Sequence, residues 1–105
     1  MNRFFLSTPE DVWFDADKAR EFEEASYYYN GNHISRATGS QTEHQTLYLT
    51  ASGRWVLNEW SQWQGKLETY EAISLEDAIL WLMRNEHEEE AIKHDTDGIV
   101  ESYEI

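Results

Sequence analysis

With 105 residues the chain has room for one domain, and the absence of cysteine excludes disulfides, thiolate nucleophiles and cysteine-bound zinc. Twenty-one acidic residues against eight Lys and Arg give a net charge of −13, which disfavours contact with nucleic-acid phosphates and anionic lipid. No apolar run reaches the length of a signal-peptide core or a membrane span, so we expect a cytoplasmic protein that does not contact a membrane.

The N-terminal third is predicted to be helical. Pro9 suits the first position of a short helix, which Thr8 would cap. Over residues 15–28, apolar side chains recur at helical spacing in a narrow stripe, which predicts a helix on the surface of the domain. Residues 33–43 are polar and contain Gly, Ser and Thr, so we expect a mobile loop there.

The middle of the chain predicts a β-hairpin. Residues 46–50 and 54–60 are rich in β-branched and aromatic side chains, and a three-residue loop that ends in Gly53 separates them. This loop length places Thr50 opposite Arg54. The resulting register puts four apolar side chains on one face of the sheet: Leu47, Leu49, Trp55 and Leu57.

A third strand is predicted to follow the hairpin. A turn at Gly65-Lys66 returns the chain as a strand over residues 68–73. Two registers stay open for this strand, because a two-residue loop places Trp60 opposite Glu71 and a three-residue loop places Trp60 opposite Tyr70.

Ser74 is predicted to cap a C-terminal helix whose first turn carries acidic side chains, as the helix dipole favours. Its apolar stripe at helical spacing comprises Leu75, Ala78, Ile79, Leu82 and Met83. Asn85 is its predicted end, and residues 95–105 are predicted to form an acidic tail or an edge strand. The predicted fold class is therefore α+β: one domain over residues 1–105, in which a three-stranded antiparallel β-meander is followed by a C-terminal helix and preceded by an N-terminal helix.

The hairpin and the helix after it resemble small, largely uncharacterised bacterial proteins that share a Trp-rich hairpin. The resemblance covers roughly residues 46–85. It rests on residues 47–50 (Leu-Tyr-Leu-Thr), 53–58 (Gly-Arg-Trp-Val-Leu-Asn) and 60–65 (Trp-Ser-Gln-Trp-Gln-Gly), followed by Tyr70-Glu71. It implies no activity and no catalytic residue.

The sheet face opposite Leu47 and Leu49 carries an unusual set of aromatic and polar side chains. Aromatic residues and Arg are enriched in binding hot spots, so this face is a candidate binding surface. It comprises Tyr48, Arg54, Asn58, Trp60, Trp63 and Tyr70. The alternative interpretation places the same aromatic side chains in a second small core beneath the N-terminal helix.

Acidic residues concentrate near the C-terminus, where residues 68–105 contain twelve acids against two bases. The predicted acidic face comprises Glu86, Glu88, Glu89 and Glu90. His87, Glu90 and His94 would share one face of a continuing helix, and such residues can bind zinc or nickel. The second His of the zinc-protease pattern is missing, so we expect a solvated acidic surface, with no metal and no cofactor.

No catalytic signature stands out, since no spacing singles out a Ser-His-Asp set and no glycine-rich loop could hold a phosphate. We therefore expect a non-enzymatic interaction module that binds a basic protein partner, in the manner of an antitoxin, an immunity protein or an inhibitor. Two alternatives stay open: a small-molecule or peptide-binding domain that uses the Trp/Tyr face, and an acidic surface that serves only solubility.

Overall fold

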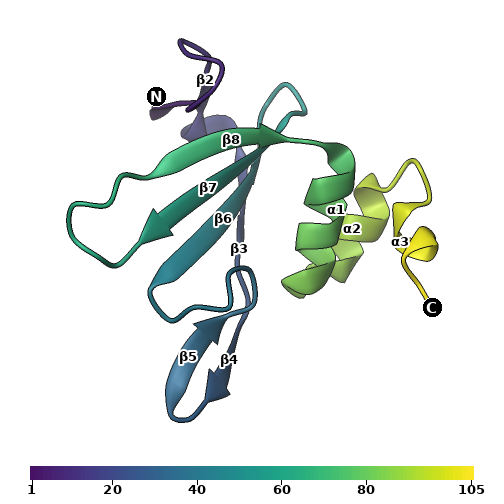
Figure 1. Cartoon of the computed structure of the whole chain (residues 1–105). Helices are drawn as coiled ribbons and strands as arrows, with labels where there is room; N and C mark the ends of the chain where they lie inside the picture. The colour runs from purple at the N-terminus through teal and green to yellow at the C-terminus, as the bar shows by residue number, and fades with distance from the viewer.

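The computed structural model describes all 105 residues, and the chain is mostly sheet, with eight strands in three sheets and three short α-helices (Figure 1). The central sheet is antiparallel, with its strands in the order β3 (Arg20–Glu23), β6 (Glu43–Leu49), β7 (Trp55–Ser61) and β8 (Thr69–Ile73). The helices α1 (Leu75–Arg84), α2 (Glu88–His94) and α3 (Ile99–Ser102) gather on one side of this sheet. No helix is long and apolar enough to span a membrane.

The predicted N-terminal helices are wrong, because this part of the chain forms strands. β1 (Arg3–Phe5) pairs with β2 (Trp13–Asp15) in a first hairpin, and β4 (Ser26–Tyr29) pairs with β5 (Asn32–Ser35) in another. Pro9 lies in the connection of the first hairpin, and residues 15–28 contain only one 3₁₀ turn, Ala16–Lys18, before β3. The predicted fold class is therefore corrected: three sheets replace the single meander, and α-helices occur only toward the C-terminus.

The physical reason lies in what each arrangement buries. A helix over residues 15–28 would bury mainly alanines and Phe22 along its narrow stripe. As a strand, β3 instead pairs its backbone with β6, and Phe22 lies opposite Leu47 in the core. Further along, Asn30 and Gly31 both have positive φ (50° and 80°), as a two-residue hairpin turn requires.

The predicted β6–β7 register is confirmed. Leu47 lies opposite Leu57 and Leu49 lies opposite Trp55, while the backbone N–H of Thr50 donates to the carbonyl of Arg54 at 2.8 Å. Leu47 and Trp55 are buried, and Leu49 and Leu57 are half-buried against the same core. The three-residue loop and the period-two pattern thus determined this register locally.

Both predicted registers of the third strand are wrong. Asn58 lies opposite Tyr70, so the connection between β7 and β8 spans residues 62–68 and is longer than either predicted turn. This register places Tyr70 and Ala72 on the same face as Val56, where an N-terminal core packs against them. The backbone N–H of Ser7 also donates to the Tyr70 carbonyl at 2.7 Å, so a distant segment fixes β8.

The predicted start and end of the C-terminal helix are confirmed. Ser74 Oγ accepts a hydrogen bond from the Asp77 N–H at 3.1 Å, and Asn85 is the C-cap of α1. Glu86 then takes a positive φ of 67°, which separates α1 from α2. Residues 95–105, predicted as an acidic tail or an edge strand, contain α3. The Asp95 carboxylate accepts hydrogen bonds from the first two backbone N–H groups of this helix, and Ile99 is buried.

Two cores lie on opposite faces of the central sheet. The helix-side core packs Phe22, Leu47 and Trp55 against buried side chains of the helices, namely Ala78, Ile79, Trp81, Leu82, Ala91 and Ile99. The hairpin-side core lies beneath the β1–β2 hairpin and comprises Leu6, Phe14, Tyr48 and Val56. Residues 33–43, predicted as a mobile loop, contain the end of β5, a turn in which the buried Ser35 Oγ accepts from two backbone N–H groups, and the start of β6.

Candidate functional site

Of the six residues of the predicted aromatic binding surface, two are buried and two more are half-buried. Tyr48 and Asn58 are buried, and the Asn58 amide donates to the Thr69 carbonyl at 3.2 Å. Tyr70 stacks on Phe4 with ring centroids 4.9 Å apart. These contacts correspond to the alternative interpretation, a second core, with the β1–β2 hairpin in place of the predicted helix as its cover.

Tyr70 and Trp60 are further held by polar contacts. The Tyr70 hydroxyl donates to Glu68 at 2.9 Å, and burial together with this hydrogen bond raises the pKa of Tyr70 well above its ordinary value. Trp60 stacks on His44 at 4.5 Å, and its Nε1–H donates to Thr46 Oγ1 at 3.1 Å. Both rings are half-buried and stabilise the sheet rather than offering a free aromatic surface.

Arg54 and Trp63 are the two exposed members of that predicted surface. Arg54 immediately precedes β7, whereas Trp63 lies beyond its end and is 65% exposed. The length of β7 separates them, so the structure does not bring the six predicted residues into one surface.

The predicted acidic face divides into one structural residue and three free ones. Both carboxylate oxygens of Glu90 accept hydrogen bonds from the Arg20 guanidinium, at 2.7 and 2.9 Å, which ties α2 to β3. The hydrogen bonds to Arg20 hold the pKa of Glu90 below its ordinary value. Glu86, Glu88 and Glu89 are exposed and form no ion pair. We call these three residues the acidic junction, since Glu86 lies between α1 and α2 and the other two begin α2.

The histidines near this junction are occupied by packing and hydrogen bonds. His87 Nε2 lies 2.7 Å from the Glu23 carbonyl, and its ring lies parallel to that of Trp81. The His94 ring contacts Trp55 edge-on at 5.3 Å. No group of three or more His, Cys, Asp or Glu side chains is placed to hold a metal ion.

Sequence reasoning missed an exposed group of tyrosines on the β4–β5 hairpin, which projects from the central sheet (Figure 1). Tyr28 and Tyr29 are 68% and 64% exposed, and Tyr27 is exposed as well. We call this hairpin the tyrosine arm. Aromatic side chains are enriched in the contact regions of protein interfaces. A two-stranded hairpin that packs on nothing else is only marginally stable, so we do not expect these exposed rings to be there for the stability of the fold.

Hydrogen bonds place the base of the tyrosine arm beside the acidic junction. The Ala25 N–H donates to the buried side-chain oxygen of Asn85 at 3.0 Å, and the Asn85 amide donates to the Trp81 carbonyl at 2.8 Å. His87 contacts the carbonyl of Glu23 a few residues away. The base of the tyrosine arm therefore adjoins the segment that carries the acidic junction, and we take the arm and the junction together as the candidate functional site.

Comparisons of the chain with protein families, with curated proteins and with solved structures found no match. The acidic junction was visible in the sequence as a charge run. The tyrosine arm had a signal too, because Asn-Gly after a run of β-forming residues is a strong local indication of a hairpin.

Proposed function

We propose that this protein is a non-enzymatic interaction module that binds a basic protein partner and modulates it, in the manner of an antitoxin, an immunity protein or an inhibitor. The observation that supports this proposal best is the tyrosine arm, whose base is hydrogen-bonded beside the acidic junction. A basic partner would meet an attractive field and an aromatic docking surface in the same region.

The charge of the chain favours a basic partner. The chain carries −13, and twelve of its twenty-one acids lie in residues 68–105. Such a field raises the rate at which a cationic partner arrives, and salt weakens it within a Debye length of about 8 Å at physiological ionic strength. The acidic junction contributes carboxylates that no cation of the chain neutralises by an ion pair.

The exposed tyrosines of the arm are suited to anchoring such a partner. A tyrosine offers a large apolar ring and a polar hydroxyl at low conformational cost, which suits a residue that anchors an interface. Tyr28 packs against His33 across the arm, with ring centroids 4.0 Å apart, and this contact orients the ring before a partner arrives. We therefore expect the arm to control how long the complex lasts and the acids to control how fast it forms.

The proposal can be tested by affinity capture with the full chain immobilised and a lysate of the organism that encodes it, at about 50 mM and about 500 mM salt. We expect a basic protein to be retained at low salt and released at high salt. Replacing Tyr28 and Tyr29 by Ser should abolish its retention. Tyr103→Ser removes an exposed tyrosine elsewhere and should change nothing. Capture that is indifferent to salt and to the arm variant would contradict the proposal.

A further inference from the structure

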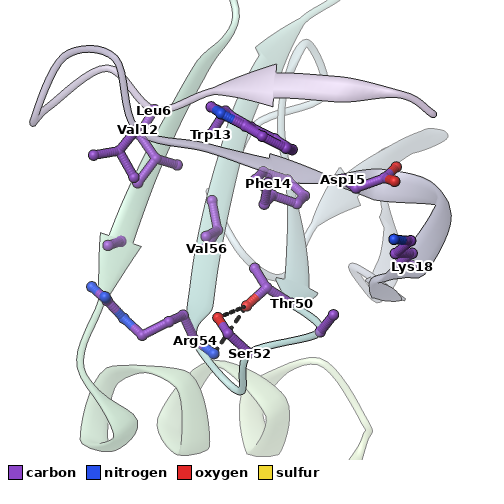
Figure 2. Close-up of a pocket in the computed structure, with 12 residues that line it drawn as sticks. Leu6, Val12, Trp13, Phe14, Asp15, Lys18, Thr50, Ser52, Arg54 and Val56 are labelled. Atoms are coloured by element: carbon purple, nitrogen blue, oxygen red, sulfur yellow. Dashed lines mark hydrogen bonds between the residues drawn. The ribbon is translucent and has the colours of Figure 1, made fainter.

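A cavity of about 320 Å³ lies between the β1–β2 hairpin and the β6–β7 turn, on the sheet face opposite the helices (Figure 2). Its volume is at the small end of the range of about 300–1,000 Å³ typical of ligand sites. Most of its lining is apolar, with Leu6, Val12, Phe14, Val56 and Ala72 among the contributing side chains. The cavity would therefore accept a small apolar body.

Two cations stand on opposite sides of this cavity. Figure 2 shows Arg54 at one side and Lys18 at the other, with the hydroxyls of Thr50 and Ser52, 3.1 Å apart, between them. Neither cationic side chain takes part in an ion pair or a hydrogen bond within the chain. Both charged groups remain available to a ligand.

Asp15, the remaining charged residue of the lining, already accepts hydrogen bonds from the backbone. One oxygen of the Asp15 carboxylate accepts from the backbone N–H groups of Asn2 and Asp17, each at 3.0 Å. The hydrogen bond from Asn2 leads the causes that lower the pKa of Asp15, so this carboxylate stays ionised. Two cations against one carboxylate leave a single excess positive charge, in a chain whose net charge is −13.

We propose that this cavity binds a small amphipathic carboxylate, with its apolar body against Phe14 and Val56 and its carboxylate held by Arg54 or Lys18. A guanidinium can bind a carboxylate through two parallel hydrogen bonds, and the single excess charge matches a monoanion. None of the residues that line this cavity belongs to the tyrosine arm or to the acidic junction, so the inference does not depend on the proposed protein partner.

The probe for the test is 2-naphthoate, whose two fused rings fit an apolar cavity and which carries one negative charge. Its neutral counterpart, 2-naphthalenemethanol, has the same rings. In an ¹⁵N-edited NMR titration of the full chain, we expect naphthoate to shift the backbone signals of lining residues such as Val12, Phe14, Ser52 and Val56. The alcohol should bind at least about fivefold more weakly, since it lacks the charge-assisted hydrogen bonds.

Two kinds of substitution test separately the contribution of the two cations and that of the apolar cavity to binding. Arg54→Gln with Lys18→Gln should weaken naphthoate binding by about tenfold and leave the alcohol unchanged. The matched control, Arg84→Gln with Lys93→Gln, removes two exposed cations on α1 and α2 and should leave both affinities as they are. Ala72→Leu fills part of the cavity and should weaken both probes.

Three outcomes would overturn the inference. The first is an absence of saturable shifts at the lining residues below about 1 mM naphthoate. The second is equal affinity for the acid and the alcohol. The third is that Arg54→Gln with Lys18→Gln changes the affinity for naphthoate no more than Arg84→Gln with Lys93→Gln does, when the spectra show that both doubly substituted chains are folded.

Discussion

The two faces of the central sheet are built in different ways. The helix-side core has nine buried members, and its helices follow the sheet directly in sequence; five members are 0% exposed, namely Leu47, Ala78, Ile79, Leu82 and Ala91. The hairpin-side core has four buried members, which lie between the central sheet and two three-residue strands and retain 2–8% exposure. The comparison indicates that one face supplies most of the stability, while the other, with its thin cover, leaves room for a cavity.

Removing a leucine from the helix-side core is the most direct test of this difference between the two faces. Leu82→Ala should lower the free energy of unfolding by about 2–5 kcal/mol, because the site is completely enclosed and the space left behind cannot be filled by water. Urea denaturation with an unchanged m-value would measure it. A loss below about 1 kcal/mol would mean that the helices do not dominate the stability of the domain.

The same substitution on the other face provides the matched measurement. Leu6 lies in the hairpin-side core and borders the cavity, so its neighbours already lack packing on one side. Leu6→Ala should therefore lower the free energy of unfolding by about 1–2 kcal/mol, less than Leu82→Ala. Equal losses at the two positions, from the same urea experiment, would contradict the proposed difference between the faces.

The two faces also differ in how far the sequence could predict them. The helix-side signals are local: the three-residue loop before Arg54, the period-two pattern of β6 and β7, and the Ser74 cap all act within a few residues. The hairpin-side core depends on distant contacts, such as the hydrogen bond from the Tyr70 N–H to Ser7 Oγ across 63 residues. No local pattern encodes that pairing, so the third-strand register and the cover over Tyr48 were predicted wrongly.

The candidate site divides in the same way. The acids of the junction were predicted because charge can be read directly from the sequence. The role of Glu90 was not, since its partner Arg20 lies seventy residues away on a strand that was predicted to be a helix. The tyrosine arm had a local hairpin signal at Asn30-Gly31, which a weak periodicity of alanines outweighed.

A smaller effect on stability is expected at the link between sheet and helices. Glu90→Gln removes the ion pair with Arg20 and should destabilise the protein modestly at pH 7, less than either leucine substitution, because both partners are partly solvated. The folded-state pKa of Glu90 lies below its ordinary value of 4.5, so the stabilisation is complete above that value and is lost as the pH falls through the folded-state pKa.

Thermal unfolding of the native chain and of Glu90→Gln between pH 7 and pH 3 would measure this dependence. The difference in Tm should shrink as the solution becomes more acidic. Glu89→Gln is the matched control, since Glu89 is exposed and has no ion pair, and its Tm should follow that of the native chain. A difference that stays constant with pH would show that Glu90 acts through packing rather than charge.

The smallest effect on stability is expected at the acidic junction, where the effect on association should be largest. Replacing Glu86, Glu88 and Glu89 by Gln removes three charges that form no ion pair within the chain, so the only expected loss of stability is the weak dipole interaction of Glu88 and Glu89 in the first turn of α2. Once the basic partner is identified, surface plasmon resonance at low salt should show association slowed several-fold and dissociation nearly unchanged.

The chain with both Tyr28→Ser and Tyr29→Ser should show the reverse, because anchoring side chains act mainly on dissociation. The control removes the same charge elsewhere, through Gln at Glu10, Glu101 and Glu104. If this control slows association as much as the junction variant, the partner responds to net charge alone, and the acidic junction has no special part in guiding it to the tyrosine arm.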